Sequence, residues 1–498
     1  MITQMRYMPV EEQSYPFQTA VHSCRLEKRS YIEDEYLMSG TANLYTETGM
    51  EHEVKVFYGN APYTTRLLVR RPAEIKNFSG NVVLEILNST ARVDIDRMWV
   101  NTWEYLTQNG DIYVGITSKG HVVESLKRFD AKRYAEVNWN NPLPERQPEA
   151  EDSLGFLPQF ESGLYWDMQT ELAGLLRSQD EKNPLRDYVA FSHPYLYLLG
   201  WSQSTGYINR TLASFAYRPE NCAAGSLFDG YLAAGGDSSL APVNSCEIRE
   251  SNGRMCRAGT APFQGIARSR EPLIAINTES ENRGANWGAD RDMPQEKFRS
   301  YQIAGTSHDA YYNMDCYYEG QLGEDAARAG TPLLYEGTAA PLDVPYHYVF
   351  HAALRNLYAW VREGVPAPHA PRIEVTATPE GSFDALMAMQ GGPSMKYENR
   401  KDLFGNSLGG IRLATQDYPI GRYESYSVRS DGSLQGLYGS VHTFPREQLQ
   451  LLYGSLAHYK ELVRSNAQSN IAEGFLLEQD EEAYVEYCVQ LAARGGLR

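Results

Sequence analysis

One serine in the sequence has the surroundings of a catalytic nucleophile. Ser202 lies at the centre of the string GWSQS, residues 200–204, directly after the apolar run Tyr195–Leu199. A nucleophile at a tight turn between a strand and a helix needs small residues two positions before and after it, because larger side chains would collide there. Gly200 and Ser204 meet that need, and the helical period that follows would place the serine at a helix N-terminus, which favours an oxyanion. The pattern predicts that Ser202 attacks a carbonyl carbon.

Two other serines have weaker claims to this role. Ser407, in the string GNSLG of residues 405–409, matches the G-x-S-x-G pattern more literally. It follows the polar stretch Lys396–Asp402 instead of an apolar strand, and no acid and histidine follow it in the usual order, so a glycine-rich turn is favoured. Ser204 also has small neighbours two positions away on both sides, but choosing it would carry the strand through Ser202. It remains a minor alternative.

His308 is the general base that the sequence predicts. A serine hydroxyl at its ordinary pKa is a poor nucleophile, so a base must lie within hydrogen-bonding distance. The usual chain order is serine, acid, histidine, with the histidine just after a strand. The apolar segment Tyr301–Ala304 leads into the string GTSH, residues 305–308, about 100 residues after the serine. The other nine histidines have no such position.

The acid that orients this histidine should come from the TESE turn, residues 278–281. This turn follows the apolar strand Leu273–Ile276, where the chain order requires a carboxylate. Glu281 and Glu279 are both candidates, and the register of the turn favours Glu281. The other glutamate would then be a solvated or supporting carboxylate.

The oxyanion should be held by two backbone N–H groups. One belongs to Gln203, the residue after the nucleophile, and the other comes from the loop after the strand Val82–Leu87, from Ser89 or Thr90. The predicted chemistry is a two-step acyl transfer that needs no metal and no organic cofactor, and no metal-binding spacing such as HExxH occurs. Acidic pH should slow acylation because a protonated His308 cannot accept a proton.

The elements that must position these residues follow an α/β pattern. Short apolar segments bounded by turn residues alternate with segments of helical period, as in parallel strands joined by crossover helices. The predicted strands are Glu53–Tyr58, Thr65–Val69, Val82–Leu87, Ile112–Ile116, Tyr195–Leu199, Leu273–Ile276 and Tyr301–Ala304. The predicted helices cover Met98–Leu106, Leu164–Leu176, Ile208–Phe215, Leu449–Tyr459 and Ala483–Leu491.

Composition and segment lengths indicate several parts in one chain. Residues 1–50 are expected to be an N-terminal extension, 51–310 an α/β core with an insertion at about 120–163, 311–394 an insertion or cap, and 395–498 a C-terminal segment packed on the core. Tyrosine is frequent, with 35 residues against 16 phenylalanines, and four tyrosines closely follow His308: Tyr311, Tyr312, Tyr317 and Tyr318. They could line a pocket for an ester, although packing roles are favoured.

The charge balance and the N-terminus bear on partners and location. The net charge of −17 disfavours nucleic acids and anionic membranes as partners. The predicted acyl-transfer chemistry implies a small-molecule ester as substrate. Residues Met1–Ser30 lack a basic start followed by an apolar stretch, so a cytoplasmic location is expected, with a secreted or periplasmic location as the alternative if a leader has been removed. Six cysteines without a CxxC spacing fit reduced thiols. Cys246 and Cys256 are near enough in sequence for a local disulfide, but free thiols are favoured.

Several of these motifs resemble one protein family. The GxSxS elbow, the TESE turn and the AGTSH string of residues 304–308 are similar to those of α/β-hydrolase domain-containing proteins. So are three longer strings: YLMSGTANLY (36–45), VVLEILNS (82–89) and DLFGNSLGGIR (402–412). The resemblance covers nearly the whole chain and implies an α/β-hydrolase fold with a triad of Ser202, His308 and a TESE glutamate. The expected activity is carboxylic ester hydrolysis; an acyltransferase, a thioesterase or a non-catalytic binding protein are the alternatives.

Overall fold

The chain folds into two compact units in a computed structural model. The structure describes residues 1–48, 52–146, 159–223, 225–245, 248–251, 254–257, 269–281, 287–312, 321–331, 337–382 and 395–498. Unit 1 comprises Met1–Pro272, Pro294–Glu296 and Glu319–Leu333, and unit 2 comprises Leu273–Met293, Lys297–Tyr318 and Leu334–Arg498. The domain boundaries expected from the sequence remain predictions.

Unit 1 is built on a mixed sheet whose centre is parallel. Its strands lie in the order β1 (Ile2–Tyr7), β2 (Tyr31–Glu47), β3 (Val54–Pro72), β5 (Ile112–Ile116), β4 (Asn81–Ile86), β6 (Tyr195–Trp201) and β7 (Gly230–Ala234). β4 pairs in parallel with β5 and β6, and β6 pairs in parallel with β7. The strands from β1 to β3 and β5 pair antiparallel. A hairpin of β8 (Ile248–Ser251) and β9 (Arg254–Arg257) also belongs to this unit.

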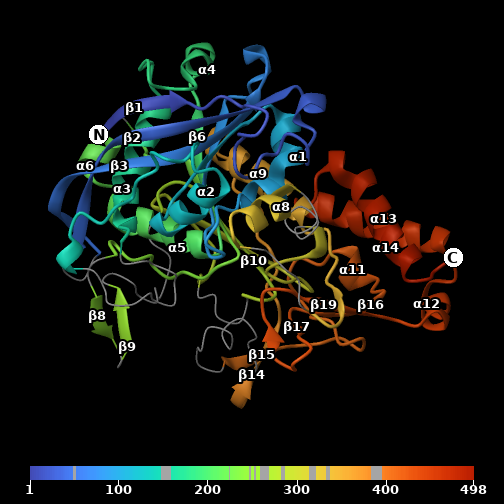
Figure 1. The fold of residues 1–498 in the computed structure, drawn as a ribbon. Helices are drawn as coiled ribbons and strands as arrows, with labels where there is room; N and C mark the ends of the chain where they lie inside the picture. The colour runs from blue at the N-terminus through green and yellow to red at the C-terminus, as the bar shows by residue number, and fades with distance from the viewer. Residues whose placement is uncertain are drawn as a thin grey trace. The chain divides into compact units, whose positions relative to one another are not determined.

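Crossover helices cover this sheet as the alternating pattern predicts. Helix α1 (Arg97–Asn109) contacts β5 and β6, α3 (Tyr165–Leu176) contacts β1 and β2, and α5 (Gln203–Arg210) contacts β6 and β7 (Figure 1). The other α-helices of unit 1 are α2 (Val123–Phe129), α4 (Arg186–Phe191), α6 (Pro219–Cys222) and α8 (Gln321–Arg328). Short 3-10 segments occupy Leu26–Arg29, Ile75–Asn77, Gly120–Val122, Pro144–Arg146 and Ser162–Leu164, and a π segment occupies Thr211–Phe215.

Unit 2 contains a smaller parallel pair and a helical end. β10 (Leu273–Thr278) pairs in parallel with β12 (Glu296–Ile303), which is flanked by β11 (Arg291–Met293). Its other strands are β13 (Ala340–Pro341), β14 (Val375–Ser382), β15 (Met395–Asn399), β16 (Gly421–Glu424), β17 (Ser427–Val428), β18 (Leu434–Gln435) and β19 (Ser440–Thr443). Its helices are α9 (His347–Arg362), α11 (Ala414–Asp417), α12 (Arg446–Tyr453), α13 (Leu456–Glu473) and α14 (Glu481–Arg494), with a 3-10 turn at Glu478–Asp480.

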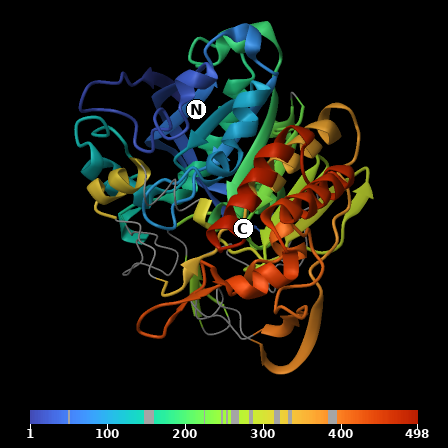
Figure 2. The same ribbon diagram turned by 90° about the vertical axis from the view of Figure 1, so that its right-hand side faces the viewer.

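The C-terminal helices α13 and α14 pack side by side, as the two red helices of Figure 2 show. The sequence predicted one helix through Leu449–Tyr459, whereas the structure ends α12 at Tyr453 and begins α13 at Leu456. Gly454 in between has φ +68°, and Ser455 caps α13 by accepting the N–H of His458. Among the described residues, no helix is both long and apolar enough to cross a membrane.

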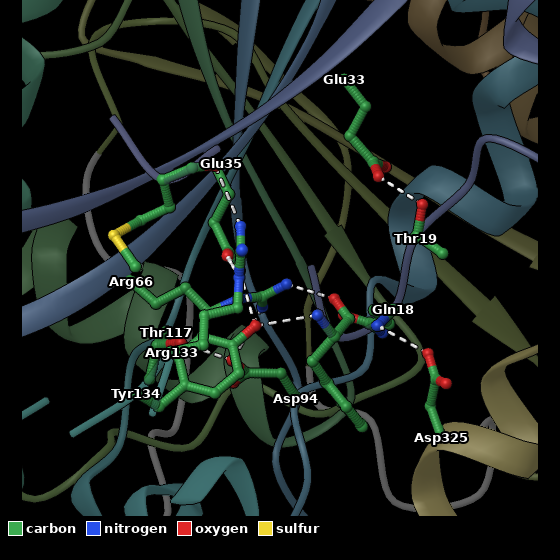
Figure 3. A network of polar contacts seen from close by, with 12 residues as sticks. Gln18, Thr19, Glu33, Glu35, Arg66, Asp94, Thr117, Arg133, Tyr134 and Asp325 are labelled. Carbon is green, nitrogen blue, oxygen red and sulfur yellow. Dashed lines mark hydrogen bonds and ion pairs between the residues drawn. The ribbon is translucent and has the colours of Figure 1, made fainter. Parts of the chain in front are cut away.

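A network of charged side chains is buried in unit 1 (Figure 3). Arg66 on β3 is fully buried and binds the carboxylates of Glu35 and Asp94. Arg133 binds the same Glu35, whose Oε1 also accepts the Tyr134 hydroxyl at 2.8 Å. Charges without water are costly unless each is paired and hydrogen-bonded, so the mutual pairing explains how they are tolerated here.

A second buried arginine extends the network to the N-terminal segment. Arg70 is four residues after Arg66 on β3, and it binds Glu33 and Asp96. Its guanidinium also donates to the backbone oxygen of Gln18 at 2.8 Å, and Arg66 donates to that of Phe17. The two arginines therefore fix both the N-terminal segment and the Asp94–Asp96 loop that follows β4.

Replacing Arg66 tests how much this charged network contributes to the free energy of unfolding. The variant Arg66→Met is expected to lower the free energy of unfolding by about 3–5 kcal/mol, because the buried Asp94 carboxylate loses its guanidinium partner and Glu35 loses one of its two. Arg6→Met is the control, since Arg6 forms an exposed pair with Glu136 and should change stability by about 0–1 kcal/mol. The measurement is denaturant unfolding of both variants, and equal small losses would contradict the account.

Candidate active site

The backbone at Ser202 has the geometry of a tight strand-to-helix turn. Ser202 joins β6 to α5 with φ +57° and ψ −120°, a conformation that residues other than glycine rarely adopt. Its N–H donates to the Ala234 oxygen of β7 at 2.7 Å. A Cβ on Gly200 would lie 3.0 Å from Ser204 Cβ, and one on Gly236 would lie 2.9 Å from the Ser202 oxygen. Small residues are therefore required around the turn. The Ser202 side chain is partly exposed.

The loop after β4 lies against the start of α5. Gln203 is the first residue of α5, where backbone N–H groups have no acceptor within the helix. The hydroxyl of buried Ser89 donates to Gln203 Oε1 at 3.4 Å, and Asn88 Nδ2 donates to the Trp201 oxygen at 3.0 Å. Thr90 is exposed and donates its N–H to Asn88 Oδ1 at 3.0 Å. The structure brings Ser89 to Gln203 and places Thr90 toward solvent.

The predicted histidine and one of the two glutamates meet in unit 2. His308 follows β12 and Glu281 follows β10, so the parallel pairing of these strands brings their carboxyl ends together. His308 Nδ1 lies 2.7 Å from Glu281 Oε1, and both side chains are buried. Glu281 Oε2 accepts the N–H of Thr278 at 2.8 Å and its hydroxyl at 2.6 Å. If the carboxylate holds a proton on Nδ1, then Nε2 is the ring nitrogen that accepts protons.

Hydrogen bonds keep Glu281 ionised. Burial raises the pKa of this carboxyl group, but the hydrogen bond and charge of His308 and the hydrogen bonds from Thr278 outweigh burial, so its pKa is lowered below the usual value. The group is therefore a carboxylate at neutral pH, and it can stabilise a positive imidazolium beside it.

The other residues of the TESE turn hold the loop that carries His308. Ser280 Oγ accepts the His308 N–H at 3.0 Å and donates to the Ser425 oxygen at 3.0 Å. Glu279 Oε2 accepts the Gly305 N–H at 2.7 Å. The TESE turn is therefore hydrogen-bonded to the GTSH loop through backbone and side-chain groups. These bonds fix the imidazole of His308 relative to Glu281. Ser202, Gln203 and Ser89 belong to unit 1, and His308, Glu281 and Glu279 to unit 2.

Comparison with known proteins identifies the family. The model of the family described as alpha/beta hydrolase domain matches residues 4–486. The chain belongs to this alpha/beta hydrolase family. The match confirms the resemblance and the α/β fold class predicted from the sequence.

The solved structures found by comparison are distant from this hydrolase domain. Apo esterase 2 of Thermogutta terrifontis is 10% identical, with a TM-score of 0.28 over 48% of this chain and 78% of the esterase. A mutant of the esterase Est22 is 9% identical, with a TM-score of 0.30 over 61% of this chain and 82% of Est22. No curated protein matches the chain.

Glu279 of this hydrolase domain lies in a different cluster from His308 Nδ1. Its Oε1 accepts the hydroxyl of Ser407 at 2.7 Å and the ammonium of Lys401 at 2.9 Å. Burial raises the pKa of Glu279, but the Lys401 charge and the Ser407 hydrogen bond outweigh it and lower the pKa. Ser407 is fully buried. Lys401 and Ser407 of the C-terminal segment therefore bind Glu279. Glu279 in turn accepts a hydrogen bond from the loop before His308.

The remaining sequence expectations fall partly outside the described residues. Tyr312 stacks on His347 with ring centroids 3.9 Å apart, which is a packing contact. Tyr317, Tyr318 and Cys246 lie outside the described residues, as does the side chain of Cys256. Within the part that the structure describes, no three His, Cys, Asp or Glu side chains are grouped to hold a metal ion.

The role of Ser407 can be tested by stability. Ser407→Ala is expected to lower the free energy of unfolding by about 1–3 kcal/mol, because the buried Glu279 carboxylate loses a hydrogen-bond donor. The matched control is Ser430→Ala, at an exposed turn, which should stay within about 0.5 kcal/mol of the parent protein. Denaturant unfolding compares the two variants. Indistinguishable unfolding curves would show that the hydrogen bond from Ser407 to Glu279 does not contribute to stability.

Proposed function

We propose that this protein is a serine hydrolase that cleaves a carboxylic ester through an acyl-enzyme formed on Ser202. The observation that carries the proposal is the backbone of Ser202, which is held at positive φ between β6 and α5 in a chain of the alpha/beta hydrolase family. Strained backbone of this kind persists where the surroundings enforce it, and it is concentrated at active sites. The net charge of −17 supports a small-molecule substrate over a nucleic acid.

The proposed reaction has two acyl-transfer steps. His308 Nε2 takes the proton of the Ser202 hydroxyl as Oγ attacks the ester carbonyl, and the N–H groups of Gln203 and Ser89 bind the oxyanion. His308 then gives its proton to the leaving alcohol, whose bond to the acyl carbon breaks. Water attacks the acyl-enzyme in the same manner and releases the acid. The Glu281 carboxylate stays ionised and stabilises the imidazolium in both steps.

The proposal assigns the triad acid to Glu281. Its support is the 2.7 Å contact with His308 Nδ1, whereas both oxygens of Glu279 are bound to Gly305, Ser407 and Lys401. For the second oxyanion donor, the supporting contact is that of Ser89 with Gln203. An acyltransferase or thioesterase would use the same residues with an alcohol acceptor or a thioester substrate, and product analysis separates these activities from ester hydrolysis.

Active-site labelling tests the nucleophile. A fluorophosphonate probe is expected to label the wild-type protein, Ser204→Ala and Ser407→Ala, but not Ser202→Ala, because only an activated serine reacts with this probe. Hydrolysis of a panel of short-chain and aryl esters should be lost in the same single variant. Labelling that survives in Ser202→Ala, or disappears in Ser204→Ala alone, would contradict the assignment. An unlabelled wild-type protein would favour a binding protein on the hydrolase fold.

The two TESE glutamates form a matched pair for testing the acid. Glu281→Gln should lower kcat by roughly 10⁴-fold, because a neutral amide neither orients nor stabilises the imidazolium. Glu279→Gln should cost much less activity and should mainly lower the free energy of unfolding, since it weakens the contacts with Lys401 and Ser407. The measurement is kcat for both variants at the pH optimum of the wild-type protein, with unfolding curves alongside. Equal and mild losses of kcat would mean that neither is the acid.

A further inference from the structure

A lysine is buried beside the first turn of α5 in unit 1. Lys119 lies three residues after the end of β5, and its side chain is fully buried. Its Nζ donates to Ser118 Oγ at 2.8 Å, to the Leu87 oxygen at 3.3 Å and to Ser204 Oγ at 3.3 Å. The same nitrogen lies 4.4 Å from the centre of the Tyr207 ring. Lysine is almost never fully buried without such partners.

The surroundings of Lys119 suit an ammonium ion. Three acceptors match the three N–H bonds of –NH₃⁺, and the nearby Tyr207 ring attracts a cation. Ser118 donates its own hydroxyl proton to the Leu87 oxygen at 2.9 Å, so its oxygen accepts from the lysine. The neighbouring anion is Asp94, whose charge favours the protonated lysine.

These contacts join the two segments that carry the proposed oxyanion donors. Leu87 begins the loop that continues to Ser89, and Ser204 is the second residue of α5, directly after Gln203. We propose that Lys119 is a positioning residue: its ammonium group ties the β4 loop to the first turn of α5 and so fixes the spacing of the Ser89 and Gln203 N–H groups. The inference rests on the proposed function, because it concerns the oxyanion formed after attack by Ser202.

The inference also explains why the elbow has serine at position 204. Space alone requires only a small residue there, since a Cβ at Gly200 would already approach Ser204 to 3.0 Å. The hydroxyl of Ser204 adds the acceptor that Lys119 needs on α5. Ser204 is completely buried, and its hydroxyl oxygen accepts the hydrogen bond from Lys119 Nζ.

The charge on Lys119 should make the reaction sensitive to alkaline pH. Burial lowers the pKa of Lys119 to about 7, and the Asp94 charge opposes that shift in part. The other groups around it are Tyr207 on α5 and, beyond Asp94, Arg66 on β3. The ammonium ion is present below its pKa and lost above it, whereas His308 must be neutral to act as a base. The pH profile of kcat should therefore fall on both sides, with an alkaline limb that belongs to Lys119.

The test compares Lys119→Met with the exposed control Lys132→Met, using a chromogenic ester and the full-length protein. Lys119→Met is expected to lower kcat by about 10²-fold, as a small misplacement of catalytic groups does, with KM nearly unchanged. The alkaline limb should disappear from its pH profile. The melting temperature of Lys119→Met at pH 6 should fall by much less than the loss of kcat would suggest. The reason is that methionine replaces a group that is costly to bury as an ion. Lys132→Met should behave as wild type.

Ser204→Ala provides the second variant, should Lys119→Met not fold. It keeps the lysine but removes its acceptor on α5, so kcat should fall by about 10-fold at unchanged KM. The alkaline limb should move to lower pH, because the ammonium form loses a hydrogen bond. The double variant should be no slower than Lys119→Met, since both changes break one link.

Two outcomes separate this inference from the proposed function. If Ser202→Ala abolishes labelling while Lys119→Met or Ser204→Ala keeps kcat and the alkaline limb of wild type, the positioning role is wrong and the hydrolase proposal stands. If the wild-type protein is neither labelled at Ser202 nor active on esters, the hydrolase proposal fails first.

Discussion

The proposed chemistry depends on one backbone constraint, the positive φ of Ser202. A non-glycine residue in such a conformation costs about 1–3 kcal/mol and persists only where its surroundings enforce it. Here the parallel pairing of β6 with β4 and β7 fixes the strand, and the hydrogen bond from the Ser202 N–H to the Ala234 oxygen fixes the turn. Gly200 and Gly236 leave the space that the turn needs. Because of this turn, Ser202 lies between β6 and α5, and the Gln203 N–H lies in the first turn of α5.

Several groups of the proposed site are held by other buried polar groups. Thr278 holds Glu281, Ser280 holds the His308 backbone, and Lys119 joins the β4 loop to α5. Such contacts are strong because little water competes with them, and they are costly when one partner is missing. The pattern resembles the second layer of hydrogen bonds that fixes reacting groups in well-ordered sites. The site and the charged interior of unit 1 therefore rely on the same physical principle.

The parallel strands could be predicted from the sequence because they are buried on both faces and form continuous apolar runs. The prediction for Ile112–Ile116 has the bounds of β5, and that for Tyr195–Leu199 covers most of β6. β7 was missed because Gly230–Ala234 is short, begins with a glycine and is followed directly by two more. The segments Glu53–Tyr58 and Thr65–Val69 were predicted as two strands, but apart from Glu53 both lie in β3 (Val54–Pro72), whose polar middle continues its pairing with β2.

Side-chain direction was harder to predict than chain order. The sequence located the TESE turn and the GTSH loop, but only the structure shows that Glu281 meets His308 while Glu279 meets Ser407. Lys119 was missed entirely, since a lysine in a sequence is expected at the surface.

The most direct measurement is a crystal structure of the protein after reaction with a fluorophosphonate. The account predicts phosphorus bonded to Ser202 Oγ, the phosphoryl oxygen accepting the N–H groups of Gln203 and Ser89 at about 2.7–3.1 Å, and His308 Nε2 within hydrogen-bonding distance of the adduct. An adduct on another residue, or a Ser202 adduct with His308 beyond reach of it, would contradict the central claim.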